Sequence, residues 1–133
     1  MDPVASRFAA LLGLLVPALL ASACGTDTQG RCLALPCPLP IALTIDVTSS
    51  TGGPAAGATI LVSGGTNGTV PCEAGTTAST CRVAGQAGTY QLEITAPGFE
   101  PAQRSVVVAG TTPECGCPTV VQQHLEVALT PAP

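Results

Sequence analysis

Lysine and tryptophan are absent from this chain of 133 residues, and charged residues make up only 9% of it. Four arginines oppose eight acidic residues, so the formal net charge is −4. Nucleic-acid binding needs a basic patch, and recruitment to anionic lipid needs a run of basic residues. An acidic chain with four scattered arginines has neither feature. We therefore expect no nucleic-acid partner and no polybasic attachment to a membrane.

Catalytic motifs are lacking as well. The chain has no Gly-x-Ser-x-Gly elbow and no Walker-type glycine loop. His124, the single histidine, would need a nucleophile and a carboxylate close by to catalyse hydrolysis. Glu93, Glu100 and Glu126 are spread over strands and a turn, where solubilising the surface explains them. We expect no enzyme activity, no catalytic residue and no cofactor.

Glycine and proline are frequent, with 15 and 13 residues, and many threonines and valines surround them. This composition disfavours long helices and favours short strands joined by turns. Runs with strand character recur at intervals of about 8–12 residues, which predicts an all-β antiparallel sandwich of about seven strands. The expected strands cover residues 41–48, 58–62, 69–72, 80–83, 89–95, 103–108 and 120–130.

The strand at residues 89–95 has the clearest pattern. Tyr90, Leu92 and Ile94 alternate with polar residues, so they fall on one face of an extended strand. An Ala-Pro-Gly turn follows, and Phe99 comes directly after it. Large apolar side chains in a small β domain usually pack inside it, so we expect Tyr90 and Phe99 in the core.

Two further patterns support the same fold class. The strand at residues 41–48 alternates cleanly, which predicts an inward face made of Ile41, Leu43, Ile45 and Val47. Asn67-Gly68 is a strong hairpin signal between two of the expected strands.

Residues 1–23 have the features of an export signal. Arg7 provides a positive charge, and residues 8–20 form an apolar run of 13 residues. A membrane-spanning helix needs about 20 residues, whereas the apolar region of a signal peptide needs roughly 7–15. A buried core helix is the structural alternative. The uniform apolar character of the run and the small residues that follow it favour the signal peptide.

The end of this signal, Leu19-Leu20-Ala21-Ser22-Ala23-Cys24, resembles the lipobox of bacterial lipoproteins. In that family the cysteine becomes the first residue of the mature protein and carries the lipid, which includes palmitate. Ala21 departs from the pattern, where leucine is usual, and Ala21-Ser22-Ala23 could be cut by an ordinary signal peptidase. A plain secreted protein is therefore the alternative. Gly25 is not the aspartate that would retain a lipoprotein at the inner membrane, so the resemblance implies the outer membrane.

The number of cysteines favours lipidation at Cys24. The chain has seven, an odd count that leaves one thiol unpaired in an exported protein. Lipid on Cys24 leaves six for three disulfides: Cys32, Cys37, Cys72, Cys81, Cys115 and Cys117.

The spacing of these cysteines suggests how they pair. Cys72 and Cys81 enclose a short polar stretch and can form a local bridge. Cys115 and Cys117 are too close to bridge each other. We expect them to pair with Cys32 and Cys37, in an order that stays open. These bridges would clamp the end of a tether, residues 24–40, to the domain.

Residues 41–130 resemble the carboxypeptidase regulatory-like domain. The resemblance depends on the Pro54-to-Ala58 turn into the second strand, the Gly88-Thr89-Tyr90 strand and the Pro97-Gly98-Phe99 turn. It implies a Greek-key sandwich of the transthyretin (prealbumin) type for residues 41–133. The segments 72–81 and 115–117 depart from the family pattern. The matching motifs are structural, so they imply a fold and little about function.

Three roles follow as hypotheses. The first is a non-enzymatic, lipid-anchored protein of the cell envelope with a structural, adhesive or protein-interaction role. The second is a carbohydrate-binding module, which would gain support if Tyr90 were exposed. The third is a metal-handling lipoprotein, with thiolates of Cys32, Cys37, Cys115 and Cys117 beside His124. Export favours disulfides over thiolates, so we expect no metal.

Overall fold

The computed structural model describes residues 36–133. The predicted signal peptide at residues 1–23, Cys24, Cys32 and most of the predicted tether lie outside the described residues. Residues 36–133 contain ten strands and no helix. The strands are β1 (Ile41–Ser49), β2 (Thr59–Ser63), β3 (Gly68–Pro71), β4 (Glu73–Ala74), β5 (Ser79–Ala84), β6 (Gly88–Thr95), β7 (Ala102–Val108), β8 (Gly110–Thr111), β9 (Thr119–Val120) and β10 (Gln123–Leu129).

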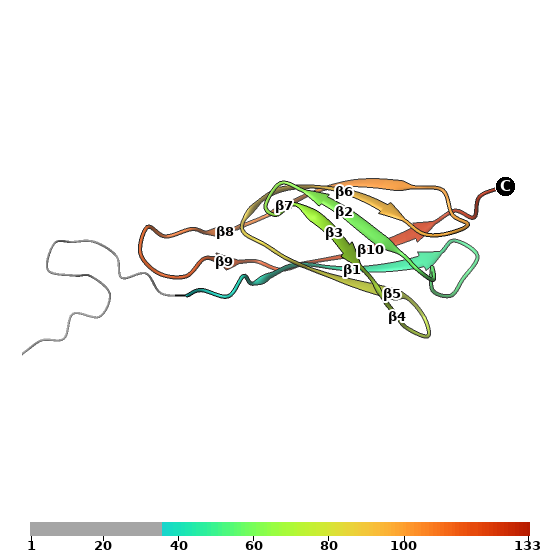
Figure 1. The fold of residues 1–133 in the computed structure, drawn as a ribbon, viewed down its shortest axis with the longest axis horizontal. Helices are drawn as coiled ribbons and strands as arrows, with labels where there is room; N and C mark the ends of the chain where they lie inside the picture. The colour runs from blue at the N-terminus through green and yellow to red at the C-terminus, as the bar shows by residue number, and fades with distance from the viewer. Residues whose placement is uncertain (1–35) are drawn as a thin grey trace, which may run out of the picture.

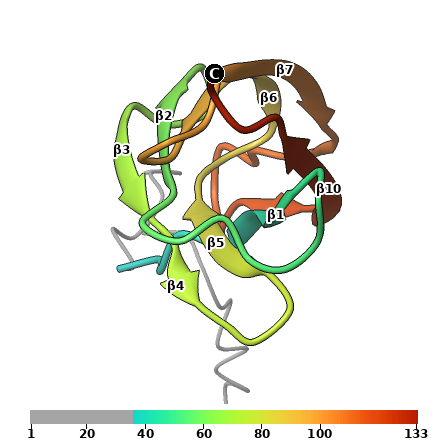
Figure 2. The same ribbon diagram turned by 90° about the vertical axis from the view of Figure 1, so that its right-hand side faces the viewer.

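Two four-stranded sheets form the two layers of the molecule (Figures 1 and 2). One has the order β10-β1-β5-β4 and the other the order β3-β2-β6-β7, while β8 and β9 form a separate hairpin. The inward residues of both sheets belong to one hydrophobic cluster. The prediction of an all-β fold with a sandwich-like arrangement is therefore confirmed at this coarse level.

One pairing differs from the antiparallel prediction. The first and last long strands, β1 and β10, are parallel, with Leu43 opposite Gln123 and Ser49 opposite Leu129. All other strand pairs of the described chain are antiparallel. Parallel neighbours need a long connection. Here the connection is the rest of the domain, so the alternation within each strand could not reveal it.

The inward face of β1 differs from the prediction at its first residue. Ile41 lies opposite Ala84 and Leu43 opposite Val83, so Ala42 is an extra residue in β1. Such a bulge changes which face the following side chains occupy. Leu43, like Ala42, is therefore fully buried, whereas Ile41 is 38% exposed. The prediction that Ile41 faces inward was wrong.

Tyr90 is the largest fully buried side chain. Its hydroxyl donates to the carbonyl of Gln86 at 2.6 Å. Gly65 and Gly85 lie against the ring and the hydroxyl so closely that a Cβ at either glycine would collide with Tyr90. The prediction of a core tyrosine is confirmed. The second aromatic, Phe99, is only partly buried against the core.

The hairpin predicted at Asn67-Gly68 connects β2 with β3 through residues 64–67. The side chain of Asn67 accepts a hydrogen bond from the Gly64 N–H at 3.3 Å. The last predicted strand, residues 120–130, is divided into β9 and β10. Between them, the Val121 N–H donates to the Ala109 carbonyl at 2.7 Å. The short strands β4 and β8 were not predicted, because a two-residue strand has no periodicity to recognise.

Candidate functional site

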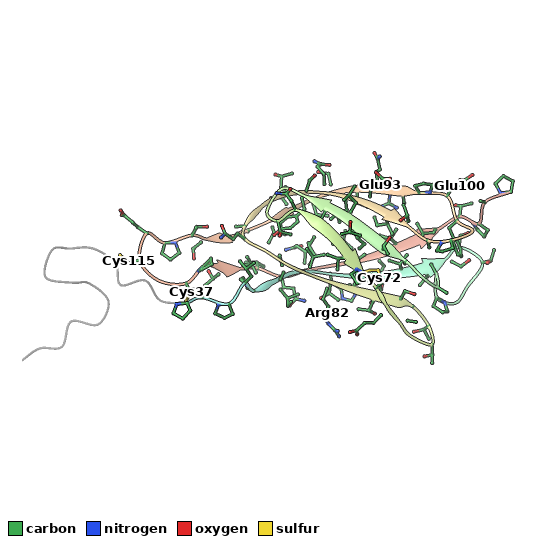
Figure 3. All side chains as sticks on the ribbon, viewed as in Figure 1. Cys37, Cys72, Arg82, Glu93, Glu100 and Cys115 are labelled. Atoms are coloured by element: carbon green, nitrogen blue, oxygen red, sulfur yellow. A yellow bond between two sulfur atoms is a disulfide. The ribbon has the colours of Figure 1, made fainter. Side chains whose placement is uncertain are left out.

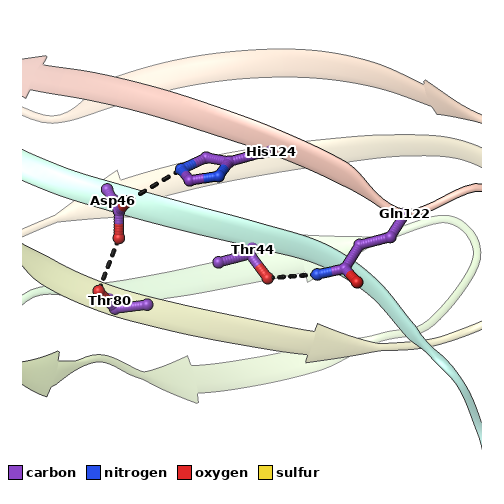
Figure 4. A network of polar contacts seen from close by, with 5 residues as sticks. All are labelled: Thr44, Asp46, Thr80, Gln122 and His124. Atoms are coloured by element: carbon purple, nitrogen blue, oxygen red, sulfur yellow. Dashed lines mark hydrogen bonds and ion pairs between the residues drawn. The ribbon is translucent and has the colours of Figure 1, made fainter.

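A polar cluster occupies the outer face of the sheet β10-β1-β5-β4 (Figure 4). It consists of Thr44, Asp46, Thr80, Gln122 and His124. The central strand β1 supplies the first two residues, and its neighbours β5 and β10 supply Thr80 and His124. Because side chains alternate along a strand, the residues that flank the buried Ile45 point to this outer face.

Asp46 is the centre of this cluster. One carboxylate oxygen, Oδ2, lies 2.9 Å from Nε2 of His124. The other, Oδ1, accepts a hydrogen bond from the Thr80 hydroxyl at 2.6 Å. A second link joins Nε2 of Gln122, which donates at 2.6 Å, to the Thr44 hydroxyl oxygen. These contacts connect β1 to both neighbouring strands.

The surroundings of Asp46 favour its ionised form. The hydrogen bond from Thr80 is the largest cause, and it lowers the pKa of the Asp46 carboxyl. Partial burial acts in the opposite direction, and the hydrogen bond with His124 and the electrostatic effects of His124 and Arg82 lower the pKa further. Asp46 is therefore a carboxylate at neutral pH, able to hold and orient the imidazole of His124.

This geometry lacks the contact that activates a nucleophile. In a nucleophile–base–carboxylate arrangement the hydroxyl bonds to the imidazole and the imidazole bonds to the carboxylate. Here Thr80 donates directly to Asp46, so the hydroxyl and the imidazole are both partners of one carboxylate. Among the described residues, no buried side-chain polar atom lacks a hydrogen-bond partner. The printed contacts of the cluster therefore join β1 to its two neighbouring strands.

His124 lies on an edge strand with its side chain 58% exposed. The prediction of a solvated histidine on the outward phase of the last strand is confirmed. Its pairing with Asp46 was not predicted, because that contact depends on the parallel register of β1 and β10. The only sign of this contact in the sequence is that Asp46 and His124 both fall on the outward phase of their strands.

Disulfides hold two different parts of the domain. Cys72 and Cys81 are bridged across nine positions of sequence, with their Cα atoms 4.2 Å apart, and Cys81 is fully buried. Cys37 and Cys117 are bridged across 80 positions, with their Cα atoms 5.4 Å apart. Cys115 is disulfide-bonded as well. The local bridge and a clamp from Cys37 to the loop before the last strand are therefore confirmed, while Cys32 lies outside the described residues.

The hypothesis of a metal centre needs thiolates, and the described residues do not offer them from Cys37 and Cys117. Sulfur atoms of Cys37 and Cys117 are bonded to each other and are not thiolates. His124 faces Asp46. Within residues 36–133, no group of three or more His, Cys, Asp or Glu residues could hold a metal ion.

A shallow depression of about 300 Å³ lies on the opposite sheet, β3-β2-β6-β7. Its outward-facing lining includes Leu61, Gln91, Glu93 and Gln103. Leu61 is 53% exposed, and the other three offer two amides and a carboxylate. Tyr90 points to the other side of β6 and is fully buried, so it offers no ring surface to a ligand.

The remaining acidic residues are not gathered into one site. Glu93 and Glu100 lie along one side of the molecule, and Arg82 lies on the opposite side (Figure 3). Glu126 is the register partner of Asp46 across β10 and β1.

Among residues 36–133, no helical segment has the length and apolar character that crossing a bilayer requires. Comparisons with protein-family models, with curated proteins and with solved structures found no match for this chain.

Proposed function

We propose that this chain is a non-enzymatic protein of the cell envelope that is anchored by lipid on Cys24 and displays a rigid β-sandwich for protein interaction. The outer membrane is its proposed location. A bacterial export signal at residues 1–23 and the lipobox-like end of that signal support the anchor. The geometry around Asp46 supports a non-enzymatic role, because the Thr80 hydroxyl and the His124 imidazole both bond to the carboxylate and join neighbouring strands.

The observation that carries the proposal is the bridge between Cys37 and Cys117. Cys37 follows the proposed lipid site by 13 positions, 37 − 24, in the numbering of the chain. A covalent bond at this point fixes the start of the domain to the loop before its last strand. Such a bond transmits a pull on the anchor directly to the sandwich, which suits a tethered protein exposed to an oxidising compartment.

The finer description of the fold is part of the proposal. Seven strands have four or more residues, namely β1, β2, β3, β5, β6, β7 and β10. This number and the two-sheet arrangement support a Greek-key sandwich of the transthyretin type, carrying a carboxypeptidase regulatory-like domain. The burial of Tyr90 and the turn at Pro97-Gly98-Phe99 after β6 support this assignment, since the resemblance depends on the same residues.

The depression lined by Leu61, Gln91, Glu93 and Gln103 is the proposed contact surface for a protein partner. It combines one exposed apolar side chain with amide and carboxylate groups, which is the mixture found at protein interfaces outside their apolar centre. Leu61 would supply the buried contact, and the two glutamines would supply hydrogen bonds.

Intact-mass measurement of the protein from membranes tests the anchor. We expect a chain that starts at Cys24, carries acyl mass and is not alkylated under denaturing, non-reducing conditions, because six cysteines form three disulfides. The Cys24→Ser variant should lose the acyl mass and leave the membrane fraction. A matched control, Ser22→Ala, keeps small residues before Cys24 and should stay acylated. An unacylated wild-type chain with free thiols contradicts the proposal.

Glycan binding is the second candidate function. The amide and carboxylate groups around Leu61 are suited to bonding sugar hydroxyls, although no aromatic platform accompanies them. Titration calorimetry with the Gln91→Ala and Gln103→Ala variants separates the two candidates. Loss of binding to an oligosaccharide would favour this second role, whereas loss of binding to a protein alone supports the first.

A further inference from the structure

Exposed apolar side chains gather at one end of the sandwich. This entry end consists of residues 36–41 and 109–122, where β1 begins and where the β8–β9 hairpin extends (Figure 1). The large apolar side chains exposed in the described chain are Leu39 (51%), Ile41 (38%), Leu61 (53%), Val107 (69%) and Val121 (60%). Leu39, Ile41 and Val121 belong to the entry end, so most of this exposure is concentrated there.

The local structure explains why these three side chains are not buried. Leu39 lies between Pro38 and Pro40, just before β1 begins. Ile41 is turned outward by the bulge at Ala42. Val121 lies in the break between β9 and β10. Because β1 and β10 are parallel, both strands begin at this end, and the apolar residues before them share it.

Charge is nearly absent from the same end. Residues 36–45 contain no acidic or basic side chain, and neither do residues 115–123. The exception is Glu114, in the loop between β8 and β9. By contrast, Asp46 and Arg82 lie on one sheet, Glu93 lies on the other, and Glu100 is at the far end (Figure 3). A surface that is apolar and carries no basic group fits an uncharged lipid interface better than an anionic one.

The entry end is the part of the domain that follows the proposed anchor in the sequence, which suggests a lipid surface as its partner. Cys24 precedes Pro36 by about 12 residues, which span at most roughly 40 Å when fully extended. The bridge between Cys37 and Cys117 binds both apolar segments of the entry end together. Figure 3 shows Cys37 and Cys115 at this end of the molecule. This end is therefore the part of the domain that the chain connects to the proposed anchor.

We infer that the entry end rests on the lipid surface, with Leu39, Ile41 and Val121 inserted among uncharged headgroups. This inference is based on the proposed lipid anchor and adds an orientation to it. The sandwich would then stand with its far end, around Glu100, away from the membrane, and both sheet faces would stay accessible. Shallow insertion of a few apolar side chains is typical of interfacial binding and does not require a membrane-spanning segment.

The absence of tryptophan makes a direct test possible, because one introduced tryptophan is the only strong fluorophore of its kind. Leu39→Trp and Leu61→Trp form a matched pair, since both leucines are about half exposed. The acylated full-length mature protein is reconstituted in phosphatidylcholine vesicles with and without brominated acyl chains. We expect the brominated lipid to quench Leu39→Trp roughly twofold more strongly than Leu61→Trp, because only the first lies at the interface.

Val121→Trp gives an independent measurement at the other apolar segment and should behave like Leu39→Trp. Equal, weak quenching of all three variants in protein that co-sediments with vesicles overturns the inference and leaves the anchor intact. A blue-shifted emission of Leu39→Trp in the absence of vesicles also overturns it, since another part of the chain would then cover this end. Protein without acyl mass that does not co-sediment contradicts the proposed function itself, and the orientation falls with it.

Discussion

The two ends of the sandwich are stabilised by different kinds of bond. At the entry end the Cys37–Cys117 bridge joins the start of the domain to the loop between β8 and β9. Tyr90 fills the interior on this side, beneath a loop in which the Gly85 N–H donates to the Pro40 carbonyl. The far end has no cysteine among the described residues. Its aromatic residue, Phe99, is only partly buried.

Main-chain hydrogen bonds join the turns of the far end instead. The Ser50 N–H donates to the Leu129 carbonyl at 2.8 Å, and the Glu100 N–H donates to the Thr130 carbonyl at 2.8 Å. The Ala132 N–H donates to the Gly98 carbonyl at 2.9 Å. These bonds connect the end of the chain to two turns that are distant in sequence.

The comparison shows where a small β domain needs covalent bonds. At the far end, turns face each other and satisfy one another's main-chain groups. The entry end exposes apolar side chains and includes Pro36, Pro38 and Pro40, which have no N–H to donate to a ladder of hydrogen bonds. A disulfide therefore holds a segment that hydrogen bonds and burial hold only weakly.

The largest expected effect is a difference in stability loss between Tyr90 and Phe99, the two aromatic residues of residues 36–133. Tyr90→Ala should lower the free energy of unfolding by about 3–5 kcal/mol, because it leaves a cavity in a fully buried place. Phe99→Ala should cost about half as much, since Phe99 already contacts solvent. Urea unfolding followed by circular dichroism measures both. Equal losses would show that the far end is packed as tightly as the entry end.

Removal of the disulfides tests the covalent side of the comparison. Restriction of the unfolded chain predicts a contribution of about 2.6 kcal/mol for the nine-position loop of Cys72–Cys81 and about 4.5 kcal/mol for the 80-position loop of Cys37–Cys117. Because Cys115 is bridged too, we expect the Cys37→Ala/Cys117→Ala variant to lose less than the second figure. Chemical denaturation of each double variant gives the values. A loss of the full amount would mean that the Cys115 bridge does not restrain this loop.

Substitutions at two glycines separate the cost of a steric clash from the cost of an unfavourable backbone conformation. Gly85→Ala should cost about 1–3 kcal/mol, because its Cβ would collide with the Tyr90 hydroxyl. Gly98→Ala should cost about 1–2 kcal/mol, because Gly98 has a φ of +80° with open space around it. Tyr90→Phe removes the hydroxyl and should rescue part of the Gly85→Ala loss while leaving the Gly98→Ala loss unchanged. A double-mutant cycle by urea unfolding measures this; strict additivity at Gly85 would contradict it.

The smallest expected effect concerns Asp46, which lies between the two ends. Its pKa in the folded protein is below the ordinary value of 3.8. Its contribution to stability is therefore present above that value and is lost as the pH falls through the folded pKa. Thr80→Val removes the largest cause of the shift and should lower stability at pH 7 by less than about 1 kcal/mol. In strong acid, where Asp46 is protonated in both the folded and the unfolded chain, this contribution to the free energy of unfolding should be the same in the wild type and the variant.

Urea unfolding across the acid range measures the effect at Asp46. The Thr44→Val variant is the matched control, since it removes a threonine hydroxyl from the same face of the sheet but one that does not bond to the carboxylate. An unchanged pH dependence in Thr80→Val would show that the hydrogen bond to Asp46 has no net effect on its ionisation.

Much of the fold was open to prediction from local patterns. Alternation at residues 89–95 correctly placed Tyr90, Leu92 and Ile94 in the core, because the period of a strand decides which face a side chain occupies. The short polar stretch between Cys72 and Cys81 correctly predicted a local bridge. Alternation failed at Ile41, since a bulge adds a residue to one strand and is visible only beside its partner.

The sequence by itself determined the seven longer strands, the hairpin at Asn67-Gly68, the even number of cysteines after Cys24 and the burial of Tyr90, because these follow from local periodicity and composition. Only the tertiary structure decided that β1 and β10 are parallel, that Asp46 meets His124, and that Cys37 bridges Cys117. Each of these joins residues about 80 positions apart. Contacts over such distances depend on how complete sheets pair and pack, and no local pattern of side chains carries that information.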